Sequence, residues 1–253
     1  MKPKSHTLFH FTKSRDTLKN VLKSGFWPRY CLEDIRWMSE EDHEYISYPI
    51  VCFCDIPLSR INEHVGFYGE FGLGLTKKWA ESNGLNPIMY ISPGNQVSKA
   101  FGEVNDHANK LHREGDGDEE EANVELAKVT MRYLLAHTKP LEGSMVVDGS
   151  PVQKAFYQES EWRYVPRNEK IKEYLRRSDF EDFELLRAEN DKTKEHCLLR
   201  FSPQDIKYIF VKSDADIPDI INFIQTELDA YPSADLKVLM SRVTSLESIS
   251  HDV

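Results

Sequence analysis

The sequence predicts a single α+β domain over residues 1–253, built around one compact mixed sheet, with a helical insertion at about 96–140. Short segments rich in β-forming residues are dispersed among amphipathic helical segments, unlike the strict βαβ order of a doubly wound fold. Hydrophobic residues make up 40% of the chain and aromatic residues 11%, which is enough for a packed core. The sequence contains no internal repeat and no linker rich in Pro, Gly or Ser that would divide it.

Seven segments have the composition expected of β-strands. The first (TLFHF) alternates for part of its length, and the second (IVCFC) is continuously apolar, as in a strand buried on both faces. The third (FGLGL) is interrupted by glycines, which is typical of a place where a ligand or another backbone approaches closely. The predicted strands cover residues 7–11, 50–54, 71–75, 88–92, 155–165, 196–201 and 206–211.

Capping residues mark the boundaries of three predicted helices. Ser14 begins one helix and Gly25 ends it, while Thr76 caps another. Asp55 and Pro57 mark the start of a short helix. The predicted helices cover residues 15–24, about 57–64, 77–83, 97–112, 125–136, 216–230 and 236–243.

Two polar stretches are predicted to connect these elements. Residues 26–42 are aromatic and charged without a clear period, which predicts a long connection lying over a site. Residues 114–121 (EGDGDEEE) combine like charges with glycine, which predicts a solvated loop or a disordered tip.

The composition excludes several classes of protein. The chain carries 32 basic and 42 acidic residues, a net charge of −10, which disfavours binding to long nucleic acids by phosphate neutralisation. No apolar stretch approaches the ~18–20 residues of a bilayer span, so we expect no membrane association. The four cysteines lack the spacing of a disulfide framework, and we expect reduced thiols in a cytoplasmic protein.

The first candidate for chemistry is His10, in the segment LFHFT. Strand alternation places it beside Leu8 on one face, away from Phe9 and Phe11. A lone histidine in such a strand is commonly a hydrogen-bonded core residue or an exposed edge residue. Thr12 and the following helix add polar groups at the end of the strand, where ligands often bind, so a functional role stays open.

The second candidate is the pair Glu159 and Glu161 in QESEWR. Residues two apart in a strand face the same side, and neighbouring carboxylates raise the pKa of one of them, as an acid–base group requires. Arg163 falls on the same face and opposes that rise. The alternative is a surface strand whose charges pair along one face, although Tyr157 and Trp162 are costly to leave in water.

The third candidate is an aromatic and glycine run, with Tyr68 and Phe71 beside Gly69, Gly72 and Gly74. Glycine beside an aromatic residue lets a flat ring approach the backbone closely. Tight turns require the same residues, so a turn is the alternative.

The cysteines do not predict a metal site. Cys52 and Cys54 share a strand face, with His64 downstream, but structural zinc needs four ligands in pairs two to four residues apart. Cys31 and Cys197 are isolated, and buried thiols commonly act as small hydrophobic side chains. The sequence has no Walker loop, Rossmann glycine fingerprint or HExxH motif, and nothing supports a thiol enzyme or a nuclease.

Five segments, in order, resemble the AbiGi family of bacterial abortive-infection proteins. They are LFHFT, PIVCFCDIPLS, HVGFYGEFGLGLTKKWAESNGLNPIMYI, FYQESEWRYVP and LRFSPQDIKYIFV, and the resemblance is weakest at 96–140. The family is described as the antitoxin-like half of phage-resistance pairs, in which infected cells are stopped before phage can spread. The resemblance implies anti-phage defence, with a cognate toxin or another defence protein as partner.

A second resemblance is to ADP-ribosyltransferase-like folds, including the DarT-like and poly-ADP-ribose polymerase groups. Those enzymes often use a histidine that orients NAD, an aromatic residue that stacks on nicotinamide, and a glutamate that bonds the ribose and stabilises the transition state. His10 resembles the first position, Tyr68 or Phe71 the second, and Glu161 the third.

This second resemblance implies an NAD-binding cleft formed by LFHFT, residues 49–80 and YQESEWR. The alternative hypothesis is a non-catalytic antitoxin or interaction module that binds a partner toxin, with an acidic stretch such as 114–121 facing a basic partner. In the first hypothesis the catalytic residues are His10, Glu159 and Glu161, and the NAD-binding residues are His10, Thr12, Tyr68, Phe71 and Arg163.

Overall fold

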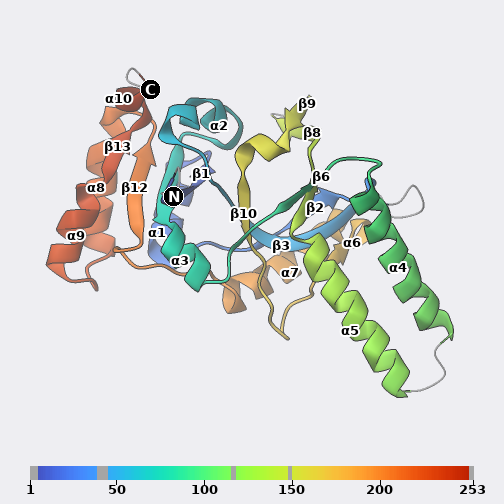
Figure 1. Ribbon diagram of the computed structural model, residues 1–253. Helices are drawn as coiled ribbons and strands as arrows, with labels where there is room; N and C mark the ends of the chain where they lie inside the picture. The colour runs from blue at the N-terminus through green and yellow to red at the C-terminus, as the bar shows by residue number, and fades with distance from the viewer. Residues whose placement is uncertain (1–4, 39–44, 115–117, 148–149, 251–253) are drawn as a thin grey trace.

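The computed structural model describes residues 5–38, 45–114, 118–147 and 150–250. Within these ranges the centre of the protein is a nine-stranded mixed sheet. Its strands are β1 (Thr7–Thr12), β2 (Arg29–Asp34), β3 (Tyr45–Cys54), β4 (Phe71–Thr76), β5 (Asn86–Pro87), β10 (Glu161–Tyr164), β11 (Leu175–Arg176), β12 (Ile206–Val211) and β13 (Val243–Ser245). The main path runs β13-β12-β4-β1-β3-β10-β5, and β2 and β11 pair with the first half of β3 (Figure 1).

Two small sheets and a set of helices complete the described structure. β6 (Met89–Ile91) pairs in parallel with β7 (Thr138–Pro140), and β8 (Glu142–Val147) forms a hairpin with β9 (Ser150–Ala155). The α-helices are α1 (Arg15–Ser24), α2 (Ile61–Tyr68), α3 (Lys77–Ser82), α4 (Gln96–Glu114), α5 (Asp118–Leu135), α6 (Arg177–Glu181), α7 (Phe183–His196), α8 (Ile217–Glu227), α9 (Ser233–Met240) and α10 (Leu246–Ile249). Three 3-10 turns are η1 (Leu58–Arg60), η2 (Phe156–Glu159) and η3 (Asp214–Asp216). Within the described ranges, no helix has the length and apolar character needed to cross a bilayer.

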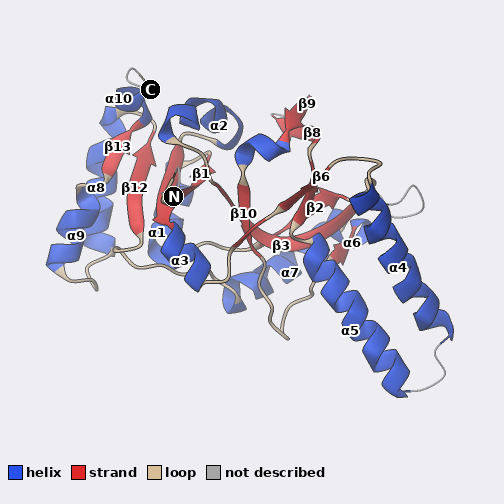
Figure 2. Cartoon of the chain, viewed as in Figure 1, coloured by secondary structure: helices blue, strands red, loops and turns tan. Residues whose placement is uncertain are grey.

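The large sheet separates two apolar clusters. On one face Leu8, Phe53 and Leu73 pack with residues of α1, α3, α8 and α9. On the other face Phe9 and Phe210 pack with residues of α2 and α10. A third cluster joins the end of α5 to β3. Helices α4 and α5 therefore attach to the sheet at one end and extend away from the strands (Figure 2).

Several sequence predictions are confirmed. The mixed α/β architecture with a large mixed sheet is present, the predicted strand 206–211 is β12, and the predicted helix 15–24 is α1. The Ser14 side chain accepts a hydrogen bond from the backbone N–H of Thr17, and Gly25 ends the helix with a φ of 93°. The Thr76 side chain accepts from the backbone N–H of Trp79 in the same way. Local capping chemistry thus fixed these boundaries.

Other predictions are wrong, for reasons that lie outside each segment. Residues 26–42 were expected to form a connection, but β2 lies there because it pairs along six residues of β3. Helix α7 extends to His196, so the strand expected at 196–201 is reduced to a bridge between Leu199 and Phe26. Asp118–Leu135 is helix α5, which includes part of the loop expected at 114–121; residues 115–117 lie outside the described ranges.

The strand expected at 155–165 is also wrong. It is divided into β9, the turn η2 and β10. Ser160, with a φ of 47° in the left-handed region, separates η2 from β10. This break places Glu159 in a turn and Glu161 in a strand, although both were expected in one strand.

We predict that Gly69→Ala lowers the free energy of unfolding by about 2–3 kcal/mol. Gly69 ends α2 with a φ of 115°, and a Cβ there would collide with the carbonyl of Thr12. Gly66→Ala, in the interior of the same helix, is the matched control, because a Cβ at that position meets no atom within 4 Å. The free energy of unfolding of Gly66→Ala should be higher than that of the wild-type protein by about 0.5–1 kcal/mol, because alanine favours a helix interior over glycine. Urea unfolding measures both; equal stability of the two variants would contradict the prediction.

Candidate functional site

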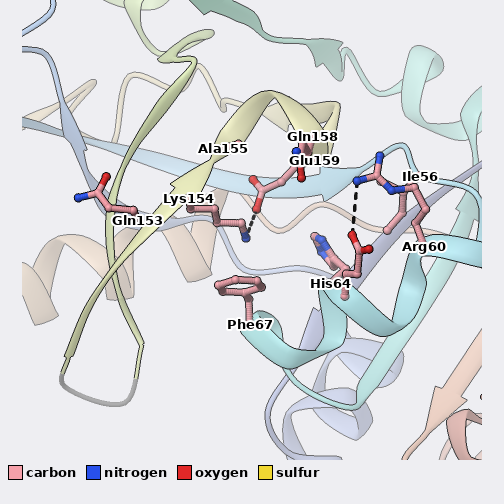
Figure 3. A pocket seen from close by; sticks show the side chains of 10 residues that line it. Ile56, Arg60, His64, Phe67, Gln153, Lys154, Ala155, Gln158 and Glu159 are labelled. Atoms are coloured by element: carbon pink, nitrogen blue, oxygen red, sulfur yellow. Dashed lines mark hydrogen bonds and ion pairs between the residues drawn. The ribbon is translucent and has the colours of Figure 1, made fainter.

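A pocket of about 210 Å³ lies between α2 on one side and the end of β9 with the turn η2 on the other. Figure 3 shows Lys154 reaching toward Glu159 above the ring of Phe67, with Arg60 on the opposite side. Its lining residues are Ile56, Arg60, Glu63, His64, Phe67, Gln153, Lys154, Ala155, Gln158 and Glu159. The wall therefore combines aromatic, amide, acidic and basic groups.

The break at Ser160 positions the acidic wall of this pocket. The backbone N–H of Asp55, just after β3, donates to the carbonyls of Glu159 and Ser160, at 3.2 Å each. This fastens η2 to the end of β3. Beyond the break, Glu161 pairs with Cys54 in the β10–β3 register and is 3% exposed. The two glutamates are both buried and both lie near the Lys139 ammonium, although they are not in the one strand that the sequence predicted.

Six charged side chains, two of which line the pocket, form a continuous row that is here called the buried ion-pair chain. Its order is Glu33, Arg163, Glu161, Lys139, Glu159 and Lys154. Arg163 donates to Glu161 at 2.6 Å and to Glu33 at 2.9 Å, and Lys139 lies 3.0 Å from Glu161 and 3.9 Å from Glu159. The buried ion-pair chain alternates in sign and contains three acidic and three basic side chains, so its formal charges cancel. Burial of charge requires such pairing.

The pairing controls the ionisation of Glu161. Burial by itself would raise the pKa of this carboxyl, but Arg163 and Lys139 more than offset that effect and hold the pKa far below its ordinary value. Burial likewise opposes the charge of Lys139, whose pKa is nevertheless raised because Glu161 and Glu33 lie close by. Glu161 is therefore ionised at neutral pH and is not a proton donor.

Tyr68 and Lys154 complete the pocket end of the chain. The Tyr68 hydroxyl and Lys154 ammonium both contact Oε1 of Glu159, and Lys154 Nζ lies 3.1 Å from the Tyr68 oxygen. Burial and the charge of Glu159 raise the pKa of Tyr68, so its phenol stays protonated and donates. Burial lowers the pKa of Lys154, while its bond to Glu159 acts in the opposite direction.

His10 lies away from this pocket. It pairs with Leu73 in the β1–β4 register, whereas Cys54, the partner of Glu161, pairs with Phe9. Because successive strand residues face opposite sides, His10 and Glu161 lie on opposite faces of the sheet. The expected single cleft containing both is therefore not formed.

His10 has the surroundings of a core histidine. Its Nδ1 lies 2.8 Å from the Cys52 carbonyl, and its ring packs on Phe26 and Phe53 with centroid distances of 5.0 and 5.5 Å. Burial lowers its pKa, so the imidazole is neutral at neutral pH. Its catalytic role remains a prediction.

The other residues expected to bind NAD are distributed unevenly. Tyr68 bonds to Glu159 at the pocket, and Arg163 is fully buried in the ion-pair chain. Thr12 and Phe71 face each other in the β1–β4 register, and neither lines the pocket. The structure thus brings together Tyr68, Glu159, Glu161 and Arg163, and leaves Thr12 and Phe71 apart from them.

Three members of the buried ion-pair chain were not identified from the sequence: Glu33, Lys139 and Lys154. Lys139 lies 22 residues from Glu161, and Glu33 lies 130 residues from Arg163. No local spacing connects such positions. One signal was available, because a strand with two glutamates and an arginine on a buried face needs another basic partner.

Cys54 and Cys197 are buried, as expected of small hydrophobic side chains, whereas Cys52 is half-buried and Cys31 is exposed. Burial raises the pKa of Cys52 and of Cys54, and the Cys54 thiol donates to the Phe9 carbonyl at 3.4 Å. Both thiols are therefore protonated at neutral pH and are poor nucleophiles. Among the described residues, no three His, Cys, Asp or Glu side chains are arranged to hold a metal ion.

We predict that His64 makes the protein sensitive to mild acid. Burial, assisted by Lys154, lowers its pKa to about 3 from an ordinary 6.5. The unfolded chain therefore binds a proton below 6.5 that the folded protein excludes, and the stability from this site falls by about 1.4 kcal/mol per pH unit between 6.5 and about 3. His64→Phe keeps a ring against Phe11 and Tyr68 and should flatten this loss in urea unfolding across that pH range. Parallel pH profiles of the two proteins would contradict the prediction.

The comparisons with known proteins identify the family. The family model described as "Putative abortive phage resistance protein AbiGi, antitoxin" matches residues 24–212, well over half of the chain. The chain is also similar to the abortive phage resistance protein AbiGi of Lactococcus lactis subsp. cremoris, with 29% identity over 254 residues, 90% of this chain and 99% of that protein. No solved structure matches the chain. The segment from the end of α1 to β12, which holds the pocket and the whole buried ion-pair chain, thus carries the match, and the chain belongs to the AbiGi family of abortive phage resistance proteins.

Proposed function

We propose that this protein is the antitoxin of an abortive phage resistance pair and acts by binding and restraining a partner toxin. The observation that carries the proposal is the match of residues 24–212 to a family described as an antitoxin. The similar protein of Lactococcus lactis, named for abortive phage resistance, supports the same cellular process. In such a pair the antitoxin holds the toxin inactive until infection.

The site geometry supports a binding role. Glu161, the glutamate that resembles a catalytic one, has both carboxylate oxygens occupied by Arg163 and Lys139. Engaging a substrate there would require breaking a buried ion pair, which is costly. The ion-pair chain instead ties β2, β7, β9, β10 and η2 into one rigid unit. A rigid surface loses little entropy on binding a partner.

Growth rescue tests this proposal. Proteins encoded beside this gene are expressed singly, and one that arrests growth is then co-expressed with this protein. We expect growth to recover and the two proteins to co-elute as a stable complex. Phage resistance from this chain alone, with no toxin and no complex, would overturn the antitoxin assignment.

NAD binding by an ADP-ribosyltransferase-like core is the second candidate. One observation favours it: the pocket places the Glu159–Tyr68 pair next to the rings of Phe67 and His64, a combination able to bond a ribose and stack on a base. Calorimetry with NAD tests it directly. The candidate predicts measurable binding that Glu159→Gln weakens about tenfold or more. Absence of binding, together with intact phage resistance of Glu161→Gln, would exclude it.

A further inference from the structure

A groove of about 130 Å³, separate from the pocket described above, lies between one face of α7 and the segment that leads into β2. Trp27, Phe183 and Leu186 form its apolar wall, and Arg29 and Arg187 are among its polar lining residues. Pockets for small ligands and cofactors commonly measure about 300–1,000 Å³. This groove is smaller than those pockets and fits one or two side chains of another protein.

Hydrogen bonds hold the floor of the groove in one conformation. The Trp27 indole N–H donates to the Asn190 carbonyl at 2.9 Å and lies 3.0 Å from Oγ1 of Thr193. The Thr193 hydroxyl donates to the Pro28 carbonyl at 2.6 Å. The Asn190 side chain accepts from the backbone N–H of Tyr30 at 3.0 Å. Because the groove is formed before a partner arrives, binding there loses little conformational entropy.

Phe183 is the exposed apolar side chain of the groove. It is the first residue of α7 and is 71% exposed. The Asp182 side chain already caps this helix end by accepting from two backbone N–H groups of the first turn, so helix formation does not require an aromatic residue here. A single exposed apolar residue is common on protein surfaces, but Phe183 borders a groove whose other apolar walls are the half-buried Trp27 and Leu186. Aromatic residues in this setting are typical anchors of a protein interface.

Three basic side chains surround the same groove. Arg29 and Arg187 line it, and the Arg29 guanidinium and the Lys194 ammonium lie 4.9 and 5.0 Å from the centroid of the Trp27 ring. These cation–π contacts hold both charges beside the groove. In the part of the chain that the structure describes, none of the three is within ion-pair distance of a carboxylate. Carboxylates of a partner would therefore find unpaired cations here.

The acidic side chains of α7 occupy the neighbouring row of the helix. Glu184, Asp191 and Glu195 follow one another at helical spacing, one residue out of step with the row that contains Arg187 and Lys194. Lys194 lies against the Trp27 ring, so the basic row is the one that faces Trp27. Asp191 also lines the groove, at the border between the two rows. This arrangement favours a partner carboxylate over the basic row and disfavours one over the acidic row, which fixes the orientation of the partner.

We propose that the groove between α7 and Trp27 binds the toxin, which inserts an apolar side chain beside Phe183 and pairs a neighbouring carboxylate with Arg29 and Arg187. The proposal rests on the antitoxin function above and names the surface that carries it out. The whole groove lies within residues 24–212, the part of the chain that matches the antitoxin family. The aromatic wall supplies the contact area, and the basic row supplies charge complementarity.

The toxin identified by growth rescue is the probe. Phe183→Ala removes the exposed ring without opening a cavity, and we expect the affinity for the toxin to be about tenfold weaker. The matched control is Tyr157→Ala, which removes another exposed aromatic side chain, at η2, and should leave the affinity within about twofold. Thermal unfolding of both variants should match that of the wild-type protein, which separates a lost contact from a lost fold.

A pair of charge variants tests the sign of the partner. Arg187 and Asp191 are both exposed and lie one turn apart on α7. At low salt, Arg187→Glu should slow association by about threefold or more, whereas Asp191→Lys should accelerate it, and both differences should shrink as salt increases. Faster association of Arg187→Glu would show that the toxin presents a basic surface to the groove and would overturn the proposed occupant.

Hydrogen exchange of the wild-type complex locates the surface without any variant. We expect the amides of α7 to exchange more slowly in the complex than in the free protein. Equal affinity of Phe183→Ala and the wild-type protein, with no protection of α7, would overturn the proposed surface while leaving the antitoxin function standing. Failure of the wild-type protein to bind any toxin would overturn the function itself.

Discussion

Replacing Arg163 by methionine is expected to lower the free energy of unfolding by about 3–5 kcal/mol, a large part of the stability of a typical domain. Arg163 has no exposed surface and donates to Glu161, Glu33 and the carbonyl of Ala136. Methionine fills similar space but leaves two buried carboxylates without their shared cation. The cost comes from those uncompensated charges, because an intact buried pair itself contributes little net stability.

The pH dependence of Arg163→Met separates this explanation from a simple packing defect. In the wild-type protein the pKa of Glu161 lies below its ordinary value of 4.5, so the stability from Glu161 is present above 4.5 and is lost as pH falls through the folded pKa. Without Arg163 the pKa of Glu161 rises. Protonation of Glu161 then removes the uncompensated buried charge that destabilises the variant. The difference in the free energy of unfolding between the wild-type protein and Arg163→Met should therefore become smaller as pH falls below about 4.5.

Urea unfolding at neutral and acidic pH measures both effects. Arg60→Met is the matched control, because Arg60 is partly exposed and its 3.5 Å contact with Glu63 is a weak surface pair. The control should change stability by less than about 0.5 kcal/mol. Superimposable unfolding curves for Arg163→Met and the wild-type protein would show that the ion-pair chain is not structural.

Replacing Phe26 by alanine is expected to lower the free energy of unfolding by about 3–5 kcal/mol, because removal of the buried ring leaves a cavity. Phe26 is buried and its ring contacts Phe53, His10, Phe201 and Trp79, with centroid distances from 4.9 to 6.2 Å. This ring is the centre of the aromatic cluster on the His10 face of the sheet. Its backbone also exchanges two hydrogen bonds with Leu199, which would persist in the variant.

The control for Phe26→Ala is Phe183→Ala. Phe183 is 71% exposed, so its truncation should change the unfolding free energy by less than about 0.5 kcal/mol. A midpoint for Phe26→Ala that matches the control would mean that the cluster collapses to fill the space. His10 then provides a second readout, since burial lowers its pKa and a cavity beside it would admit water and raise that pKa toward its ordinary value.

The predictions from sequence succeeded where the signal was local. Ser14, Gly25 and Thr76 placed helix ends correctly, because a cap is formed by atoms a few residues apart. The apolar runs of β4 and β12 were found because burial leaves a compositional trace. Phe26 shows the opposite case: the sequence predicts a connection there, because the partners of Phe26 come from four separate parts of the chain.

The candidate site divides in the same way. Glu159, Glu161 and Arg163 were recognised as one group because they are close in sequence, and they do lie together. The sequence could not show that Lys139, Lys154 and Glu33 neutralise them, because those partners come from β7, β9 and β2. Nor could it show that His10 faces the other side, which depends on how β1, β3 and β10 are ordered in the sheet.

The sequence by itself determined the α/β character, the capped helices, the resemblance to the AbiGi family and the acidic composition of residues 114–121. Each depends on residue type and short spacing, which folding does not alter. Only the tertiary structure decided which face each strand residue occupies and which charges meet. Burial makes an unpaired charge costly, so Glu159 and Glu161 are stable only where β9 and β7 bring Lys154 and Lys139 to them, beside Arg163 of β10. That requirement is a property of the assembled sheet.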